Sequence, residues 1–300
     1  MRIAFVGLPL AALLLARDGH EIVWAGVCRR DALGVRRLRR ILGPKVHLVP
    51  DLAKHASAVR ELGPDLVVSW FWTKKIPAVF RAAGKLGALG VHPSLLPRHR
   101  GPDPTFWAID AGDVETGVTA HELEDEYDTG AILGVERLAI DPRWNAWTLA
   151  KKLDRPSLRL LRKTVQMYEN PSTVRRAAQD ERDATEAPAP SDDDLEIRWS
   201  WPAARVVRRV LAASPWPGAF TAIGGDTLVV TDARVTDDFP SVLAPGQAFV
   251  RKDGVAIVRA ADKAVELRSG RSDDDESPLD AADLAAVIDD VRDAEAHLPP

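Results

Sequence analysis

The N-terminal part of the chain alternates between short apolar runs and segments of helical composition. Residues 2–6 and 21–27 are apolar on both sides, which is typical of buried strands in a parallel sheet. Residues 11–18 between them have helical composition, and Gly19 fits the end of a helix. Residues 66–72 repeat the strand pattern. This order of elements predicts an α/β domain in which helices cover both faces of a parallel sheet.

The C-terminal third has a different pattern. Short strand-like runs alternate with turns rich in Gly and Asp, at residues 227–230, 247–250, 255–259 and 264–267. They predict a small antiparallel barrel or sandwich, followed by a helix in the acidic, Ala-rich residues 280–296. The stretch ATEAPAPSDDD before this region has too little apolar surface to fold alone. We therefore predict a domain at 1–183, a linker at 184–195 and a second domain at 196–300.

Composition narrows the class of protein. With 300 residues, 46% of them hydrophobic and 28% charged, the chain has the balance of a globular protein of two ordinary domains. A formal charge of -4 argues against a protein that coats nucleic acid, although a local basic patch is compatible with it. The single Cys28 favours a reducing compartment, so we expect the cytoplasm. Gly7 and Pro9 interrupt the apolar N-terminus, which argues against a membrane segment.

Three common kinds of site lack their motifs. The first strand is followed by Gly7 alone, where a dinucleotide-binding turn needs three glycines. The histidines at 92, 99 and 121 do not have the spacing of a zinc site, so we expect no metal. Ser94 lies in a turn flanked by prolines, without the glycines of a nucleophile elbow, which argues against serine hydrolase chemistry.

Two segments contain the candidate chemistry. In GALGVHPSLLPRHRGPDPTFWAI, His92 ends a predicted strand, at the edge of the sheet where α/β proteins bind ligands. In GVTAHELEDEYDTGAIL, a strand with Thr119 and His121 runs into an acidic loop that ends at Asp128. One interpretation is a structural histidine and a solvated acidic turn. The other is that Asp128 folds back to His92 and raises its pKa, so that the ring takes a proton from an attacking amine.

Together these segments resemble the formyltransferase family, which includes methionyl-tRNA formyltransferase, sugar-amine formyltransferases and formylating domains of natural-product assembly lines. The similar motifs are HPSLLP with RHRG behind it, ETGVT and DTGAIL, and later WSWPAARVVRRVLAASPWPGAF. The resemblance implies a Rossmann-like domain followed by a small OB-like barrel. It also implies transfer of the formyl group of 10-formyltetrahydrofolate to a primary amine, through a tetrahedral intermediate, at an Asn, a His and an Asp.

Carried over to this sequence, the His is His92 and the Asp is Asp128, but the Asn position holds Gly90. The resemblance assigns that Asn a hydrogen bond to the developing oxyanion, and losing one such donor typically costs on the order of 10² to 10³ in rate. Three explanations stay open. Another donor replaces it, with Trp72, Thr73 and His99 as candidates; the chemistry has shifted; or the protein is a non-catalytic folate-binding or regulatory homologue.

The resemblance also implies where the folate binds. The pocket is expected between the loop after residue 72, the turn after His92 and the acidic loop before Asp128. The cofactor-binding residues expected there are Lys75, Ile76, Ser94, Leu95, Leu96, Pro97 and Tyr127. Lys74 and Lys75 are expected either to pair with the glutamate tail of the folate or to be ordinary solvated charges.

A basic segment near the N-terminus bears on the identity of the acceptor. Residues 29–45 contain seven basic residues, where the tRNA-specific members of the family carry a basic insertion. However, Leu38, Ile41 and Leu42 interrupt the arginines at helical spacing, which an amphipathic surface helix explains more simply. We therefore expect a small amine, such as an amino sugar, an amino acid or a carrier-bound aminoacyl group, with methionyl-tRNA as the alternative.

Overall fold

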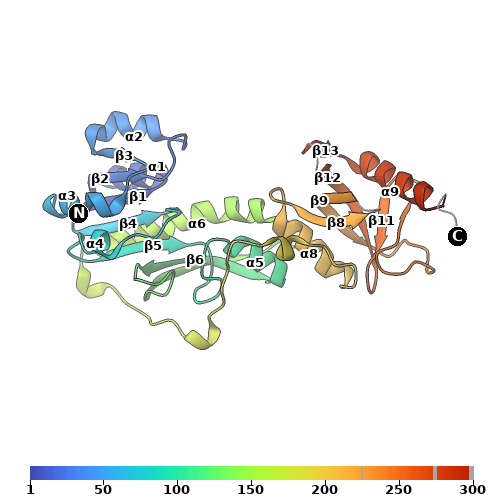
Figure 1. Cartoon of the computed structure of the whole chain (residues 1–300). Coiled ribbons are helices and arrows are strands. Elements are labelled where there is room, and N and C mark those ends of the chain that lie inside the picture. The colour runs from blue at the N-terminus through green and yellow to red at the C-terminus, as the bar shows by residue number, and fades with distance from the viewer. Residues whose placement is uncertain (224–225, 273–275, 297–300) are drawn as a thin grey trace. The chain divides into compact units, whose positions relative to one another are not determined.

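The structure is a computed structural model that describes residues 1–223, 226–272 and 276–296 (Figure 1). Contacts within the chain divide it into two units. The first consists of Met1–Pro104, Glu115–Ala139 and Lys151–Pro188. The second consists of Thr105–Val114, Ile140–Ala150 and Ala189–Pro300. The second unit therefore includes two short segments from the first half of the sequence. Its composition could not be predicted from the order of secondary-structure elements along the chain.

The first unit is built around a seven-stranded sheet in the order β3-β2-β1-β4-β5-β6-β7. Its strands are β1 (Arg2–Gly7), β2 (Glu21–Val27), β3 (Val46–Leu48), β4 (Leu66–Trp70), β5 (Ala88–His92), β6 (Glu115–Glu122) and β7 (Ile132–Ala139). The strands from β3 to β5 pair in parallel, whereas β5 with β6 and β6 with β7 pair antiparallel. The predicted Rossmann-like parallel sheet is thus confirmed, with an antiparallel extension at one edge.

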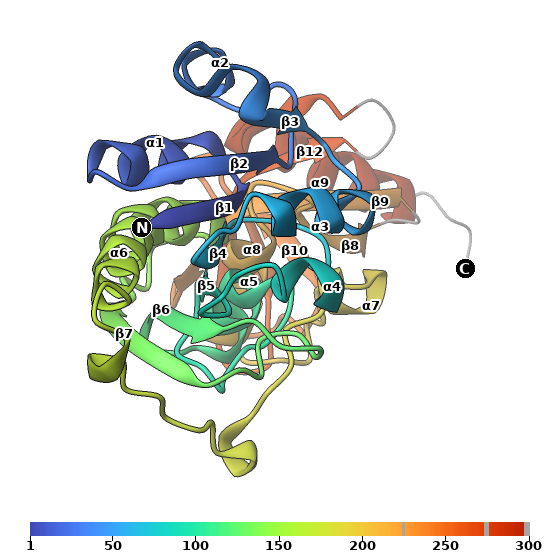
Figure 2. The ribbon, with the colours of Figure 1, turned by 90° about the vertical axis from the view of Figure 1, so that its left-hand side faces the viewer.

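Helices cover both faces of this sheet, as the strand–helix alternation predicts (Figure 2). Helices α1 (Pro9–Arg17) and α6 (Ala146–Met167) lie on one face, and α3 (Leu52–Glu61) and α4 (Ala78–Arg81) lie on the other. Successive side chains of β1 alternate between the faces, so that Ala4 and Val6 join a core with Phe80 of α4. The helix α2 (Val35–Leu42) precedes a 3-10 turn (Gly43–Lys45) and contains four of the seven basic residues of segment 29–45.

The second unit is β-rich and antiparallel, as predicted. Its sheet has the order β10-β11-β12-β9-β8, with β13 paired to β12. The elements are α5 (Pro104–Ala111), α7 (Asp192–Leu195), α8 (Ala203–Ala213), β8 (Ala219–Ile223), β9 (Asp226–Thr236), β10 (Ala248–Val250), β11 (Ala256–Arg259), β12 (Ala264–Ser272), β13 (Pro278–Leu279) and α9 (Ala281–Ala296). Within it, the buried Arg209 of α8 donates to Asp110 of α5, with Nε 2.7 Å from Oδ1.

The segment predicted as a linker is partly tied to the first unit. Arg100 donates its backbone N–H to Thr185 O at 2.9 Å, and Ala187 donates to Arg100 O at 2.6 Å. Ala187 is fully buried. The segment before it contains the 3-10 turns Pro171–Thr173 and Glu181–Asp183. The domain limits 1–183 and 196–300 remain a prediction. Among the described residues, no helix is long and apolar enough to cross a bilayer.

Candidate active site

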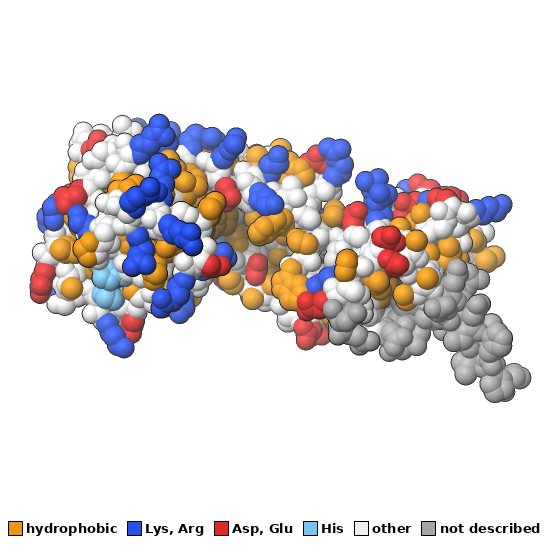
Figure 3. Space-filling view, turned by 90° about the horizontal axis from the view of Figure 1, so that it is seen from above, with side chains coloured by type: hydrophobic (Ala, Val, Ile, Leu, Met, Phe, Trp, Pro, Cys, Tyr) orange, Lys and Arg blue, Asp and Glu red, His pale blue; other side chains and the backbone are white. Residues whose placement is uncertain are grey.

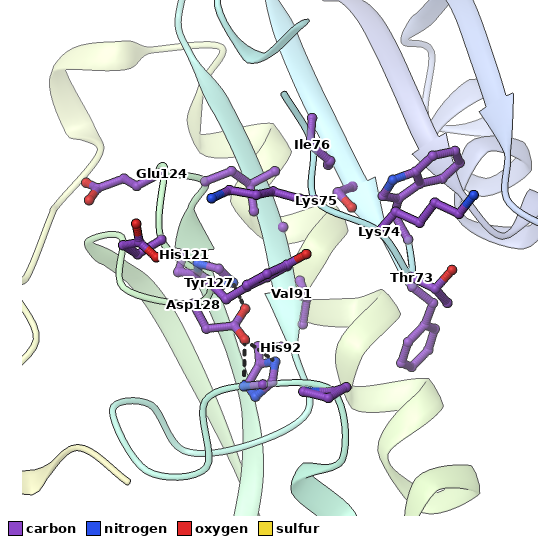
Figure 4. A pocket seen from close by; sticks show the side chains of 18 of the residues that line it. Thr73, Lys74, Lys75, Ile76, Val91, His92, His121, Glu124, Tyr127 and Asp128 are labelled. Atoms are coloured by element: carbon purple, nitrogen blue, oxygen red, sulfur yellow. Dashed lines mark hydrogen bonds and ion pairs between the residues drawn. The ribbon is translucent and has the colours of Figure 1, made fainter. Parts of the chain in front are cut away.

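A pocket lies where β4 and β5 end in the first unit (Figure 4). Its volume is about 530 Å³, which is the size of a small-molecule site. Three segments line it: the loop that follows β4, the end of β5 with the loop at residues 101–104, and residues 121–128, which run from the end of β6 into the loop after it. The first two segments follow the carboxyl ends of the parallel strands β4 and β5, where we expect a ligand, and the third comes from the antiparallel strand β6.

His92 and Asp128 meet in the wall of this pocket. His92 Nδ1 lies 3.4 Å from Asp128 Oδ2, and both side chains are largely buried. On the other side of the ring, His92 Nε2 lies 2.7 Å from the carbonyl oxygen of His99. A carbonyl oxygen only accepts hydrogen bonds, so Nε2 carries the proton. Nδ1 is therefore the nitrogen that is available for proton transfer, and Asp128 lies beside it.

The loop around Asp128 is held in an unusual conformation. Asp128 has a φ of 58°, in the left-handed region that few side chains favour. Gln179 Nε2 donates to the carbonyl oxygens of Asp128 and Gly130, at 2.7 and 2.8 Å, and Gly101 N–H donates to Asp128 Oδ2 at 2.9 Å. A Cβ on Gly130 would lie 1.9 Å from Glu122 O, so only glycine fits there. These contacts fix the carboxylate against His92.

The turn after His92 is held by hydrogen bonds within the chain. Ser94 is fully buried and its hydroxyl donates to Arg98 O at 2.6 Å. Leu96 N–H donates to Thr119 Oγ1 at 3.1 Å, and that hydroxyl donates to Ser94 O at 2.7 Å. These bonds position the loop that supplies the His99 carbonyl. Of the seven residues expected to bind folate, Lys75, Ile76 and Tyr127 line the pocket, whereas Ser94, Leu95, Leu96 and Pro97 do not.

Gly90 also lines the pocket, two residues before His92 on β5. A Cβ at this position would lie 3.1 Å from Leu123 Cδ2, so Leu123 occupies part of the space that a larger residue would need. Two of the three expected replacement donors, Trp72 and Thr73, line the pocket, and His99 does not. Trp72 Nε1 is buried and has no hydrogen-bond partner among the described residues. It is thus a donor that a bound molecule can satisfy after a small movement of the ring.

His121 is a pocket residue to which the sequence analysis assigned no role. It lies on β6 directly opposite Gly90 of β5 and is 2% exposed. Its Nε2 is 3.5 Å from Asp128 Oδ1, and its Nδ1 is 2.8 Å from Glu122 O. Side chains alternate along a strand, so Thr119 and His121 lie on one face of β6. This alternation is the sequence feature from which His121 could have been predicted as a pocket residue. The pairing with Gly90 was not visible, because register depends on the tertiary structure.

The buried His121 should make the fold sensitive to acid. Burial, and secondarily the nearby His92, lower the pKa of His121 to about 4, although Asp128 opposes the shift. Between pH 6.5 and 4 the unfolded chain therefore binds more protons at this residue than the folded chain, and stability falls as the pH falls. We expect this residue to reduce the free energy of unfolding by roughly 1–2 kcal/mol between pH 7 and pH 5.

Urea unfolding at the two pH values measures this effect. His121→Asn and His121→Gln should both show a smaller loss of stability on acidification than the parent chain, because neither side chain titrates. An unchanged loss in both variants would show that His121 is not buried in its neutral form.

The sequence matches two family profiles over most of its length. The profile described as "Formyl transferase" matches residues 50–165, and "Formyl transferase, C-terminal domain" matches residues 191–287. The chain belongs to the formyltransferase family. The methionyl-tRNA formyltransferase of Anaeromyxobacter dehalogenans (strain 2CP-C) is 34% identical to this formyltransferase over 267 residues, which cover 83% of this chain and 85% of the relative.

Solved structures support the fold of this formyltransferase. HypX from Aquifex aeolicus, solved in complex with tetrahydrofolic acid, matches with a TM-score of 0.67 at 21% identity, over 95% of this chain and 46% of the HypX chain. The N-formyltransferase from Helicobacter canadensis, solved with folinic acid and dTDP-3-aminofucose, matches with a TM-score of 0.68 at 15% identity, over 88% of this chain and 98% of that chain. At these identities the likeness shows the fold alone.

Proposed function

We propose that this formyltransferase takes the formyl group of 10-formyltetrahydrofolate and transfers it to a primary amine of a small molecule. The observation that carries the proposal is the His92–Asp128 pair, 3.4 Å apart in the wall of a ligand-sized pocket. A polarised imidazole next to a carboxylate is the arrangement that moves protons in acyl transfer. His92 is the general base, and Asp128 orients its ring and stabilises the charge that the ring gains.

The pocket has side chains that suit a folate. Phe71, Trp72 and Ile76 provide apolar wall for a flat ring, and the unpaired Trp72 Nε1 is a donor for one of its polar atoms. Tyr127 and Lys75 lie together, with Lys75 Nζ 5.8 Å from the ring centroid. Lys75 and Lys74 are exposed cations that fit the carboxylates of a glutamate tail. The turn of Ser94, Leu95, Leu96 and Pro97 contributes by supporting His92 and the His99 carbonyl.

The proton path follows from the tautomer of His92. When bound, 10-formyltetrahydrofolate supplies a formyl carbon attached to a nitrogen leaving group. His92 Nδ1 accepts a proton from the amine as the amine nitrogen bonds to that carbon, and Nδ1 then returns the proton to the departing nitrogen. His92 Nε2–H stays bonded to His99 O throughout. For a neutral amine, the proton taken from the acceptor thus ends on the leaving group, and the ring is restored. An acceptor that arrives as an ammonium ion first releases its additional proton to water.

The charges around the pocket favour a small cationic acceptor. Glu124, Asp125 and Glu126 are exposed at the pocket. Asp125 is paired with Arg81, so Glu124 and Glu126 are the carboxylates that raise the local concentration of an ammonium ion. The same carboxylates repel a polyanion. This is the physical reason for placing a small amine before a nucleic acid as the acceptor.

A specific surface supports methionyl-tRNA as the second candidate. The helix α2 exposes Arg36, Arg37, Arg39 and Arg40, and no ion pair is formed by these four side chains with any described residue. Figure 3 shows Lys and Arg side chains gathered on one face of the first unit. The relative from Anaeromyxobacter is named a methionyl-tRNA formyltransferase. An unpaired basic helix is what phosphate contacts require.

One experiment tests the reaction and the acceptor together. Calorimetry with tetrahydrofolate is expected to show binding, and 10-formyltetrahydrofolate is then expected to release tetrahydrofolate when a panel of amino sugars, amino acids and charged tRNA is added.

The quadruple variant Arg36→Gln/Arg37→Gln/Arg39→Gln/Arg40→Gln should keep the kcat/KM for a small amine within about twofold. If charged tRNA is the substrate, the same variant should raise its KM about tenfold or more and weaken its salt dependence. No release with any amine would overturn the proposal.

A further inference from the structure

Asp128 lies between two histidines, His92 and His121, whose ring nitrogens have the same kinds of neighbour. His92 Nδ1 faces Asp128 Oδ2 at 3.4 Å, and His121 Nε2 faces Asp128 Oδ1 at 3.5 Å. The other nitrogen of each ring contacts a backbone carbonyl, which is His99 O for His92 and Glu122 O for His121. The three side chains all line the pocket, and Figure 4 shows them next to one another.

The carbonyl contacts determine which atoms of these rings accept hydrogen bonds. Since Glu122 O can only accept, the proton of a neutral His121 is on Nδ1 and the lone pair is on Nε2. The lowered pKa of His121 agrees with this neutral form at pH 7. The Glu122 carboxylate does not compete for the ring, because it is bonded to Arg176 Nε at 2.6 Å.

The inner atoms of the cluster therefore form a set of acceptors. His121 Nε2 and Asp128 Oδ1 both present lone pairs at a separation of 3.5 Å, which is beyond a normal hydrogen bond. Two acceptors that face one another are favourable only when a donor lies between or beside them. Asp128 Oδ2 already accepts from Gly101 N–H at 2.9 Å, so Oδ1 is the carboxylate oxygen left for a bound group. A primary ammonium or amine, with two or three N–H donors, satisfies both atoms.

We propose that His121 Nε2 and Asp128 Oδ1 form the amine-binding subsite of this formyltransferase, and that His121 is a further catalytic residue that contacts the acceptor nitrogen. This inference rests on the proposed transfer to a primary amine. In this proposal the two histidines have different roles. His121 binds the amine by accepting a hydrogen bond, and His92 removes the proton. The proposal also accounts for the choice of a nitrogen nucleophile, because a hydroxyl or thiol has a single hydrogen and cannot donate to both acceptors.

A matched pair of variants tests the subsite. His121→Asn keeps a donor for Glu122 O near the position of Nδ1 and removes the acceptor at Nε2, whereas the longer His121→Gln places an acceptor oxygen near the position of Nε2. We expect His121→Asn to raise the KM for the panel amine that supports release by about 10- to 100-fold, with an unchanged dissociation constant for tetrahydrofolate. His121→Gln should stay within about fivefold of the parent. An unchanged KM in His121→Asn, or equal losses in both variants, would overturn the subsite.

A second measurement does not need the acceptor to be known. Methylammonium chloride is titrated into the tetrahydrofolate complex of the ¹⁵N-histidine-labelled protein, and tetramethylammonium chloride is the control with the same charge and no N–H group. We expect a saturable shift of the His121 Nε2 resonance with methylammonium and none with tetramethylammonium. Equal shifts with both ions, or no shift with either, would contradict the subsite.

The two measurements separate the failure of this inference from the failure of the proposed function. If the parent chain releases tetrahydrofolate with an amine and His121→Asn behaves as the parent, the subsite is wrong and formyl transfer stands. If no amine supports release but methylammonium shifts His121, the subsite stands and the transfer reaction is wrong.

Discussion

His92→Ala and Asp128→Ala are each expected to reduce kcat/KM for formyl transfer by about 10³-fold or more. His92 Nδ1 and Asp128 Oδ2 are 3.4 Å apart and act on the same proton, so removal of either disables the other. The double variant should therefore be hardly slower than the slower single variant. Initial-rate assays with 10-formyltetrahydrofolate and subsaturating amine measure kcat/KM for the three variants.

A histidine elsewhere in the same unit serves as the control. His55 of α3 packs against Trp24 and His47, away from the pocket. His55→Ala should keep the rate within about twofold. Calorimetry with tetrahydrofolate checks that the His92 and Asp128 variants still bind and fold. A folded His92→Ala or Asp128→Ala chain with full activity would show that its assigned role is wrong, and additive losses would show that the two residues act separately.

Gly90→Asn is expected to increase kcat, by up to about 10²-fold, if a missing oxyanion donor limits the reaction. The backbone of Gly90 lies outside the left-handed region, so an asparagine can adopt it. Its Cβ would lie 3.1 Å from Leu123 Cδ2, which is the end of a flexible side chain and must move by a few tenths of an ångström. Because Gly90 lines the pocket, we expect the amide group to face it.

Two further variants distinguish the effect of the new hydrogen-bond donor from the steric effect of the larger side chain. Gly90→Ala adds the same Cβ without a donor, so it measures the steric cost alone, and Gly90→Asn should be faster than it. Combining Gly90→Asn with Leu123→Ala removes the contact and should preserve or increase the gain. A Gly90→Asn chain slower than Gly90→Ala in both backgrounds would indicate that the reaction uses another donor, with Trp72 and Thr73 of the pocket wall as the next residues to test.

The local pattern of apolar and polar residues predicts the strands and helices of this chain well, because each of them is determined by which of its own residues are buried. The strand Glu21–Val27 is buried on both faces and was predicted with these limits. The strands β11 and β12 and the helix α9 begin within one residue of their predicted starts. The resemblance of the HPSLLP and DTGAIL segments to one family likewise identified His92 and Asp128 before their contact was visible.

Only the tertiary structure decided which atoms meet. The contact of His92 with Asp128 closes a loop of 36 residues, and the β5–β6 register that sets His121 opposite Gly90 depends on how two distant strands pair. For the turn from Ser94 to Pro97, the folate contact that the resemblance implies stays a prediction. Only the structure shows that Ser94 donates to Arg98 O and Leu96 N–H donates to Thr119 Oγ1. Short-range pattern reports burial and turn geometry, whereas hydrogen-bond partners and tautomers are set by residues far apart in sequence. The sequence therefore determined the family and the two-part fold and predicted the His92–Asp128 pair, and only the tertiary structure placed His121 in the pocket.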